Sequence, residues 1–299
     1  MTDWLWVIFT LVAAASQTAR NSMQKELTST IGTVAATQAR FLFGLPFAVL
    51  FLAVSSAVLG APPSILAADT LAFTFAGGLT QVFATAMMLA AMRTRSFVVT
   101  ITYTKIEPVI VLLFALVFLS ELPTPAAILG VIITTVGVLV MSWPRGATRA
   151  EGWLLTTALG LGAGALFAAS AVFYRGGILS LPDGPFVLNA TATLVTALAF
   201  QSVAVTLYLA IFDRPALVAL LRAWRRSLPA GFFGALASQF WFLAFAIQSA
   251  SLVRALALVE ILFAQAISRR LFQQTTSGRE LFGIVLIVAG VLVLLLAGT

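Results

Sequence analysis

Long apolar runs separated by short polar breaks fill the whole chain. The runs cover approximately residues 4–23, 34–59, 70–92, 97–119, 124–142, 153–174, 185–211, 228–248, 252–271 and 280–298. Each is close to the ~20 residues that a helix needs to cross a bilayer. Because lipid offers the backbone no hydrogen-bond partners, runs of this length must form helices. The pattern therefore predicts an all-α integral membrane protein with ten transmembrane helices.

Composition agrees with this prediction and excludes several kinds of chemistry. Of 299 residues, 61% are hydrophobic and only 9% are charged, whereas a soluble domain has about 25% charged residues. The chain has no Cys and no His, which excludes disulfides, Cys/His zinc sites and Ser-His-Asp hydrolysis. Neither of its two lysines follows a glycine, so no Walker A loop exists. We therefore expect no enzymatic activity, no metal and no cofactor.

The positive charges predict how the chain is oriented in the membrane. Loops joining helices 1–2, 3–4, 5–6, 7–8 and 9–10, with the start of helix 2, are assigned fourteen Lys and Arg residues, and the opposite loops and termini only Arg175 and Arg254. Basic loops stay in the cytoplasm, so we expect both termini on the outer side. The net charge of +7 reflects this orientation, and we expect no nucleic-acid partner.

The two halves of the sequence resemble each other. Adding 153 to Glu107, Gly130 and Gly137 gives Glu260, Gly283 and Gly290. Five helices are an odd number, so a second copy must enter the membrane upside down. The sequence therefore predicts two inverted five-helix repeats, residues 1–147 and residues 148–299.

This ten-helix inverted repeat resembles the drug/metabolite transporter superfamily, in particular its bacterial amino-acid and metabolite exporters, including aromatic amino-acid exporters. The Glu-Pro at 107–108, the Ser-Glu at 120–121 and the spaced glycines carry the resemblance. It implies a secondary transporter of the bacterial inner membrane that exports amino acids or similar metabolites by alternating access. Helices 1, 3, 4, 6, 8 and 9 would line the cavity, and helices 5 and 10 would be peripheral. Many relatives have their termini inside, unlike our expectation from the charges.

Charged residues inside the membrane are costly and are therefore candidate site residues. Lys105 and Glu107 lie within the fourth apolar run, and Glu260 is the repeat counterpart of Glu107. On a straight helix Lys105 would point about 200° away from Glu107, but Pro108 removes a backbone hydrogen bond and should bend the helix. A substrate carboxylate is a natural partner for Lys105. The alternative interpretation is a structural ion pair.

Polar and aromatic side chains at helical spacing give four further candidates. Tyr103 shares a face with Glu107 in helix 4, and Gln81 lies on a polar stripe of helix 3. Ser238 and Trp241 lie on a mixed stripe of helix 8. An aromatic wall with a few donors suits an amino acid with a large side chain. Ordinary helix packing is the alternative for each residue.

Two other functions compete with transport. A membrane transferase acting on a lipid or prenyl substrate would need clustered aspartates or a His base, and a channel would need a filter loop. The sequence has none of these. The expected partners are a small-molecule substrate and the bilayer, with protons as a candidate coupling ion, and we expect a monomer.

Overall fold

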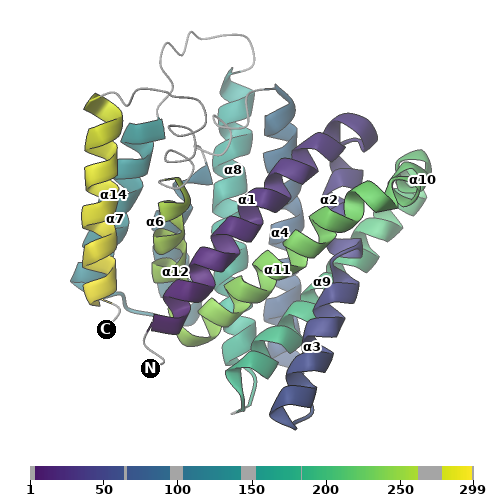
Figure 1. Ribbon diagram of the computed structural model, residues 1–299, viewed down its shortest axis with the longest axis horizontal. Coiled ribbons are helices and arrows are strands. Elements are labelled where there is room, and N and C mark those ends of the chain that lie inside the picture. Colours follow the sequence, from purple (N-terminus) through teal and green to yellow (C-terminus); the bar gives the residue numbers. More distant parts are fainter. Residues whose placement is uncertain are drawn as a thin grey trace.

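The computed structural model describes residues 4–63, 66–94, 104–142, 153–182, 184–261 and 278–297. Within these ranges every regular element is helical (Figure 1). The helices of the first half are α1 (Leu5–Ile31), α2 (Thr33–Leu42), α3 (Leu45–Leu59), α4 (Ala68–Thr94), α6 (Glu107–Leu119) and α7 (Pro125–Ser142). Those of the second half are α8 (Trp153–Leu179), α9 (Phe186–Phe212), α10 (Arg214–Arg222), α11 (Trp224–Ile247), α12 (Ala250–Leu256), η2 (Ala257–Val259) and α14 (Gly278–Ala297).

The helices have the length and apolar character of a multi-pass membrane protein. Five helical segments of the described chain are long and apolar enough to cross a membrane: Thr33–Leu59, Ala68–Met92, Leu154–Leu179, Phe186–Phe212 and Trp224–Ile247. Shorter apolar helices cover Glu107–Leu119, Pro125–Val140, Ala250–Val259 and Leu281–Leu296. Many Leu, Val and Phe side chains lie exposed on their outer surfaces, as a lipid-facing surface requires.

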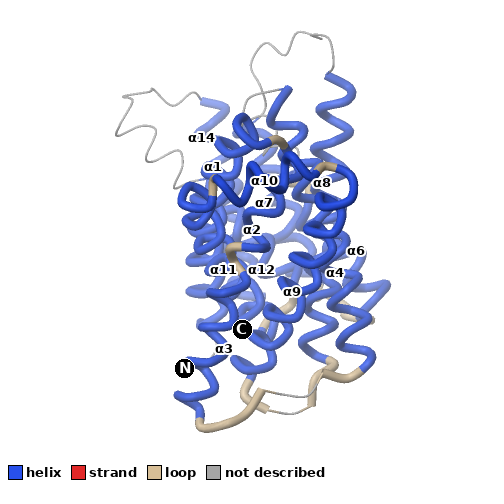
Figure 2. Tube along the Cα trace, turned by 90° about the vertical axis from the view of Figure 1, so that its right-hand side faces the viewer, coloured by secondary structure: helices blue, strands red, loops and turns tan. Residues whose placement is uncertain are grey.

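The helices pack in pairs. α1 packs against α11, α4 against α8 and α7 against α14. Figure 1 shows the α7–α14 pair at one edge of the molecule, while α1 and α11 run obliquely across the face toward the viewer. The start of α1 and the end of α14 lie at the same end of the molecule, where Figures 1 and 2 mark the two termini. The resemblance implied that helices 5 and 10 are peripheral, and α7 and α14 lie at the corresponding positions in the chain.

Glycines allow α7 and α14 to approach closely. A Cβ atom added at Gly137 would lie 2.8 Å from the backbone nitrogen of Ile287 and 2.9 Å from the carbonyl oxygen of Gly283. A Cβ atom added at Gly130 would lie 3.1 Å from the carbonyl oxygen of Gly290. Small residues at such crossings let dispersion forces hold helices together where lipid provides no hydrophobic drive.

The structure corrects several boundaries predicted from the sequence. The run 34–59 is divided into α2 and α3 around Phe43 and Gly44, with Pro46 in the first turn of α3. The predicted loop near 212–227 contains the separate helix α10. Residues 97–103 of the predicted fourth helix and 262–271 of the predicted ninth helix lie outside the described ranges.

Several cations that the sequence assigned to loops lie inside helices, and three of them belong to ion pairs or buried contacts. α1 continues to Ile31, which places Arg20 in its interior. Arg175 lies within α8 and Arg254 within α12. Arg20 and Arg254 are buried, with 1% and 7% of their surface exposed. A buried cation does not indicate orientation in the way that a loop cation does, so the charge asymmetry rests on the remaining residues.

Candidate functional site

A break in the helical backbone brings Lys105 and Glu107 to the same cavity. Thr104 is helical, Lys105 and Ile106 form a turn, and α6 begins at Glu107 with Pro108 in its first turn. The bend expected from Pro108 is therefore present. On a straight helix the side chains of Lys105 and Glu107 would point in nearly opposite directions, whereas here both line the same cavity. The cavity is lined by Gln17, Arg20, Asn21, Met88, Thr104, Lys105, Glu107, Phe167, Arg254 and Glu260.

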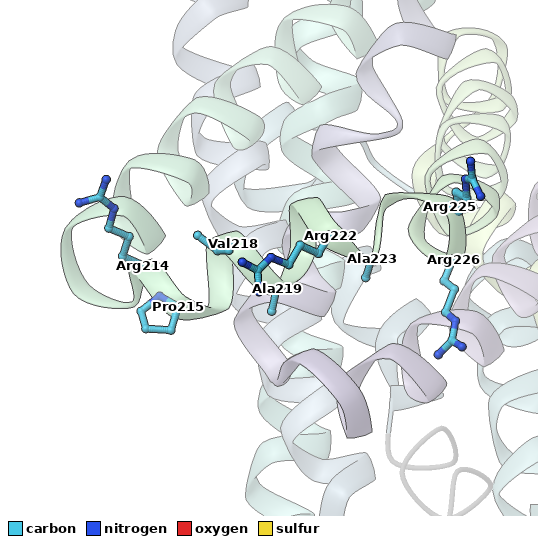
Figure 3. Close-up of a pocket in the computed structure, with 8 residues that line it drawn as sticks. All are labelled: Arg214, Pro215, Val218, Ala219, Arg222, Ala223, Arg225 and Arg226. Atoms are coloured by element: carbon cyan, nitrogen blue, oxygen red, sulfur yellow. The ribbon is translucent and has the colours of Figure 1, made fainter.

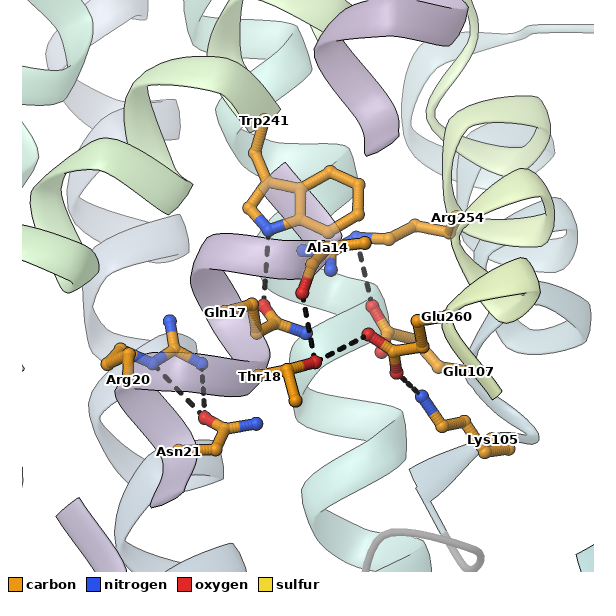
Figure 4. A network of polar contacts seen from close by, with 10 residues as sticks. All are labelled: Ala14, Gln17, Thr18, Arg20, Asn21, Lys105, Glu107, Trp241, Arg254 and Glu260. Carbon is orange, nitrogen blue, oxygen red and sulfur yellow. Dashed lines mark hydrogen bonds and ion pairs between the residues drawn. The ribbon is translucent and has the colours of Figure 1, made fainter. Parts of the chain in front are cut away.

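Two of the ion pairs that connect the first half of the chain to the second lie at this cavity. Lys105 Nζ donates a hydrogen bond to Glu260 Oε1. Arg254 Nε lies 3.1 Å from Glu107 Oε1. The four side chains are 7–15% exposed, so solvent screens these pairs only weakly. Thr18 of α1 donates to the second oxygen of Glu260 at 3.4 Å (Figure 4).

Trp241 lies where α1, α11 and α12 meet. Its indole Nε1 donates to Gln17 Oε1 at 3.1 Å. The guanidinium carbon of Arg254 lies 4.2 Å from the indole ring centre, which is a cation–π contact. Phe245, one turn along α11, stacks on Trp241 with ring centres 6.1 Å apart. The aromatic stripe of α11 therefore contacts a cation of the ion-pair cluster.

Ser238 lies on the same stripe and contacts a different arginine. Arg40 of α2 donates to Ser238 Oγ and to Thr85 Oγ1, both at 3.3 Å. Arg40 is 2% exposed. Arg20 of α1 donates from two nitrogens to Asn21 Oδ1, at 3.1 and 2.6 Å. The partners of both guanidiniums are thus neutral side chains.

Gln81 belongs to a separate buried network. Its Oε1 accepts from the Tyr174 hydroxyl at 3.1 Å and from Gln201 Nε2 at 3.0 Å. Gln201 also donates to the carbonyl oxygen of Gly78 at 3.1 Å. These bonds tie α4 to α8 and α9, and Gln81 does not line the Lys105 cavity.

Of the seven residues chosen from the sequence, three surround the cavity directly: Lys105, Glu107 and Glu260. Trp241 and Ser238 lie next to arginines, and Gln81 lies in the separate network. Tyr103 lies outside the described residues. Sequence analysis missed Gln17, Arg20, Arg40 and Arg254. The polar residues Gln17, Asn21, Gln24 and Thr28 recur at helical spacing and indicate a polar face. Only the first two lie within the predicted first helix, which ended at residue 23, so this face was too short to recognise.

The cavity is closed around its polar groups. Its volume is about 30 Å³, close to the volume that one molecule occupies in liquid water.

A larger hollow of about 890 Å³ lies beside α10 (Figure 3). Arg214, Arg222, Arg225 and Arg226 line it, and all four are exposed. It is an open basic surface at the end of the molecule opposite the chain termini.

Comparisons with known proteins agree with this architecture. Residues 4–143, just under half of the chain, match the EamA-like transporter family. A solved structure titled only "Crystal structure of protein" is similar over 97% of this chain and 96% of its own, with a TM-score of 0.68 and 14% identity. That likeness shows a shared fold and nothing about function. A search of curated proteins finds no match. The first half of the chain is therefore similar to the EamA-like transporter family.

Proposed function

We propose that the chain exports amino acids or similar small metabolites, including large neutral and aromatic ones, across the bacterial inner membrane by alternating access. In this proposal residues 1–147 and 148–299 are two inverted five-helix repeats. The two ion pairs that join the halves at this cavity are the observation that carries the proposal. Lys105 of the first half binds Glu260 of the second, and Arg254 of the second binds Glu107 of the first.

These contacts suit a site that must open and close. A buried charge is stable only with a partner, so breaking a pair requires a replacement. A substrate carboxylate replaces Glu260 at Lys105, and a substrate ammonium group then neutralises the freed carboxylate. Because the substrate competes with an internal carboxylate, binding stays weak enough for release. A proton on Glu260 would also free Lys105, which makes protons the candidate coupling ion.

The cavity's size and the aromatic pair stacked near Arg254 fit the same cycle. A space of about 30 Å³ holds no amino acid, so the halves must separate before substrate enters. Lys105 and Ile106 form a turn before Glu107, and the 3-10 turn η2 precedes Glu260. Irregular backbone at these two points lets each helix move about its glutamate. Trp241 and Phe245 supply the flat apolar surface for a large side chain.

A counterflow assay tests this function. Purified protein in liposomes is loaded with one unlabelled amino acid, and uptake of the same labelled amino acid is followed across a panel of substrates. We expect preloading to accelerate uptake for at least one amino acid, and a proton gradient to change its rate if protons are coupled. Absence of exchange with every amino acid, in liposomes shown to contain folded protein, would overturn the proposal.

A further inference from the structure

Arg20 and Arg40 are two buried cations that meet at Gly234. A Cβ atom added at Gly234 of α11 would lie 3.0 Å from Arg40 Cγ and 3.4 Å from Arg20 Cδ. Both side chains therefore pack over this glycine, one from α1 and one from α2. They are 1% and 2% exposed, and they carry like charges, so in the empty protein they repel each other in a poorly screened environment.

The described part of the chain provides no carboxylate for this pair. Arg20 donates to Asn21, and Arg40 donates to Thr85 and Ser238, all of which are neutral. Arg20 Nη1 and Arg40 Nε are buried and lack a hydrogen-bond partner. The nearby Glu260 and Glu107 already pair with Lys105 and Arg254. Four cations thus face two carboxylates, an excess of two positive charges.

The excess charge adjoins the proposed transport cavity. Arg20 lines the same cavity as Lys105 and Glu260. Figure 4 shows it next to Asn21, with Thr18 between it and Glu260. A buried ion without a counterion is strongly destabilising even after its surroundings relax. An unpaired donor of Arg20, which lines this polar cavity, and one of Arg40, which packs with Arg20 over Gly234, therefore indicate a position that a ligand anion fills. Guanidinium groups match carboxylate and phosphate oxygens in geometry.

We propose that Arg20 and Arg40 form an anion subsite that makes the transporter prefer substrates with a net negative charge. The anionic group is a second carboxylate or a phosphate, in addition to the carboxylate at Lys105. The inference rests on the proposed transport of small metabolites and narrows the substrate class from zwitterions to anions. It also explains why Gly234 has no side chain, since a Cβ atom there would press on both stems.

Thermal unfolding of the purified protein in detergent tests the subsite without requiring transport. The probes are glutamate, succinate and inorganic phosphate, compared with leucine and with potassium chloride at equal ionic strength. We expect the anions to raise the unfolding midpoint more than leucine does, and chloride to leave it nearly unchanged. A larger rise in the unfolding midpoint with the dicarboxylates identifies the anionic group as a carboxylate, and a larger rise with phosphate identifies it as a phosphate.

Variants decide whether the two arginines carry the effect. Arg20→Gln and Arg40→Gln each remove charge-assisted hydrogen bonds, so anion affinity should fall about 10- to 100-fold. Each should also raise the midpoint of the ligand-free protein, because like-charge repulsion is relieved, whereas loss of a purely structural residue would lower it. Arg40→Lys keeps the charge and should retain part of the anion effect. Arg226→Gln, a change on the exposed basic surface, is the matched control.

Two results would overturn the subsite. One is a wild-type midpoint that responds to the anions no more than to chloride. The other is an anion response that persists unchanged in both Gln variants. These results are separable from failure of the proposed function, because counterflow of neutral amino acids could proceed without any anion response. Conversely, anion binding without counterflow of any amino acid would contradict the proposed amino-acid transport and would still support the anion subsite.

Discussion

Glu107 and Glu260, which lie 153 positions apart in related segments, each form an ion pair with a cation of the opposite half. The cations themselves are not at matching positions, since Lys105 precedes Glu107 by two residues and Arg254 precedes Glu260 by six. The glutamates of the two ion pairs therefore occupy equivalent positions in the two related segments, while the cations do not. This asymmetry gives the two pairs different neighbours: Lys105 lines the cavity, and Arg254 also contacts Trp241.

Lys105→Gln should abolish or strongly reduce transport while leaving a folded, monodisperse protein. The substitution removes the cation that a substrate carboxylate would bind and leaves Glu260 without its partner. Lys105→Arg should keep some activity, because the charge survives with a different geometry. Counterflow rates and size-exclusion profiles of the two variants check this.

The structural alternative predicts a different outcome for the same residue. Lys105→Gln leaves Glu260 as an unpaired buried charge in either case, so some stability is lost. If Lys105 only holds helices together, that loss of stability alone should account for the loss of transport. Adding Glu260→Gln should then restore folding and transport together. Full transport by that double variant would show that the substrate carboxylate binds elsewhere.

Trp241→Ala should weaken transport of tryptophan more than transport of alanine. The indole is 3% exposed and forms a stacked surface with Phe245, and such a ring contributes ~0.5–1.5 kcal/mol beyond its buried area. We therefore expect the half-saturation constant for tryptophan to rise about two- to tenfold. Trp241→Phe keeps a ring over Arg254 and should change it less. Equal losses for both substrates would indicate that Trp241 acts through packing alone.

Gly137→Ala should destabilise the protein, whereas Gly278→Ala should not. A Cβ atom at Gly137 would lie 2.8 Å from Leu286 Cβ, while one at Gly278 would meet nothing within 4 Å. Overpacking of this kind costs typically about 1–3 kcal/mol. Thermal unfolding in detergent measures both variants, which lie on the paired helices α7 and α14. A Gly137→Ala midpoint equal to that of Gly278→Ala would mean that the two helices do not rely on this close contact.

The sequence predicted the helical membrane fold well, because apolar runs near bilayer length have few alternatives. Charges within such runs stand out, so it also singled out Lys105, Glu107 and Glu260, which line one cavity. It missed Arg20 and Arg254, since a cation near the end of an apolar run looks the same whether it faces water or a partner helix. Their burial depends on contacts with Asn21, Glu107 and Trp241. Such contacts are long-range or depend on where a helix ends, which periodicity does not determine.

A reporter fused after Thr299 should report the non-cytoplasmic side, and one inserted at Ala223 the cytoplasm. The exposed arginines around α10 lie at the end of the molecule opposite the two termini. Clustered exposed Arg residues stay in the cytoplasm during insertion, so the termini belong on the outer side. Replacing the four arginines of this surface with Gln should weaken the preference and give mixed reporter signals. A Thr299 fusion active only in the cytoplasm, with the Ala223 fusion active only outside, would show that the charge rule does not set the orientation of this chain.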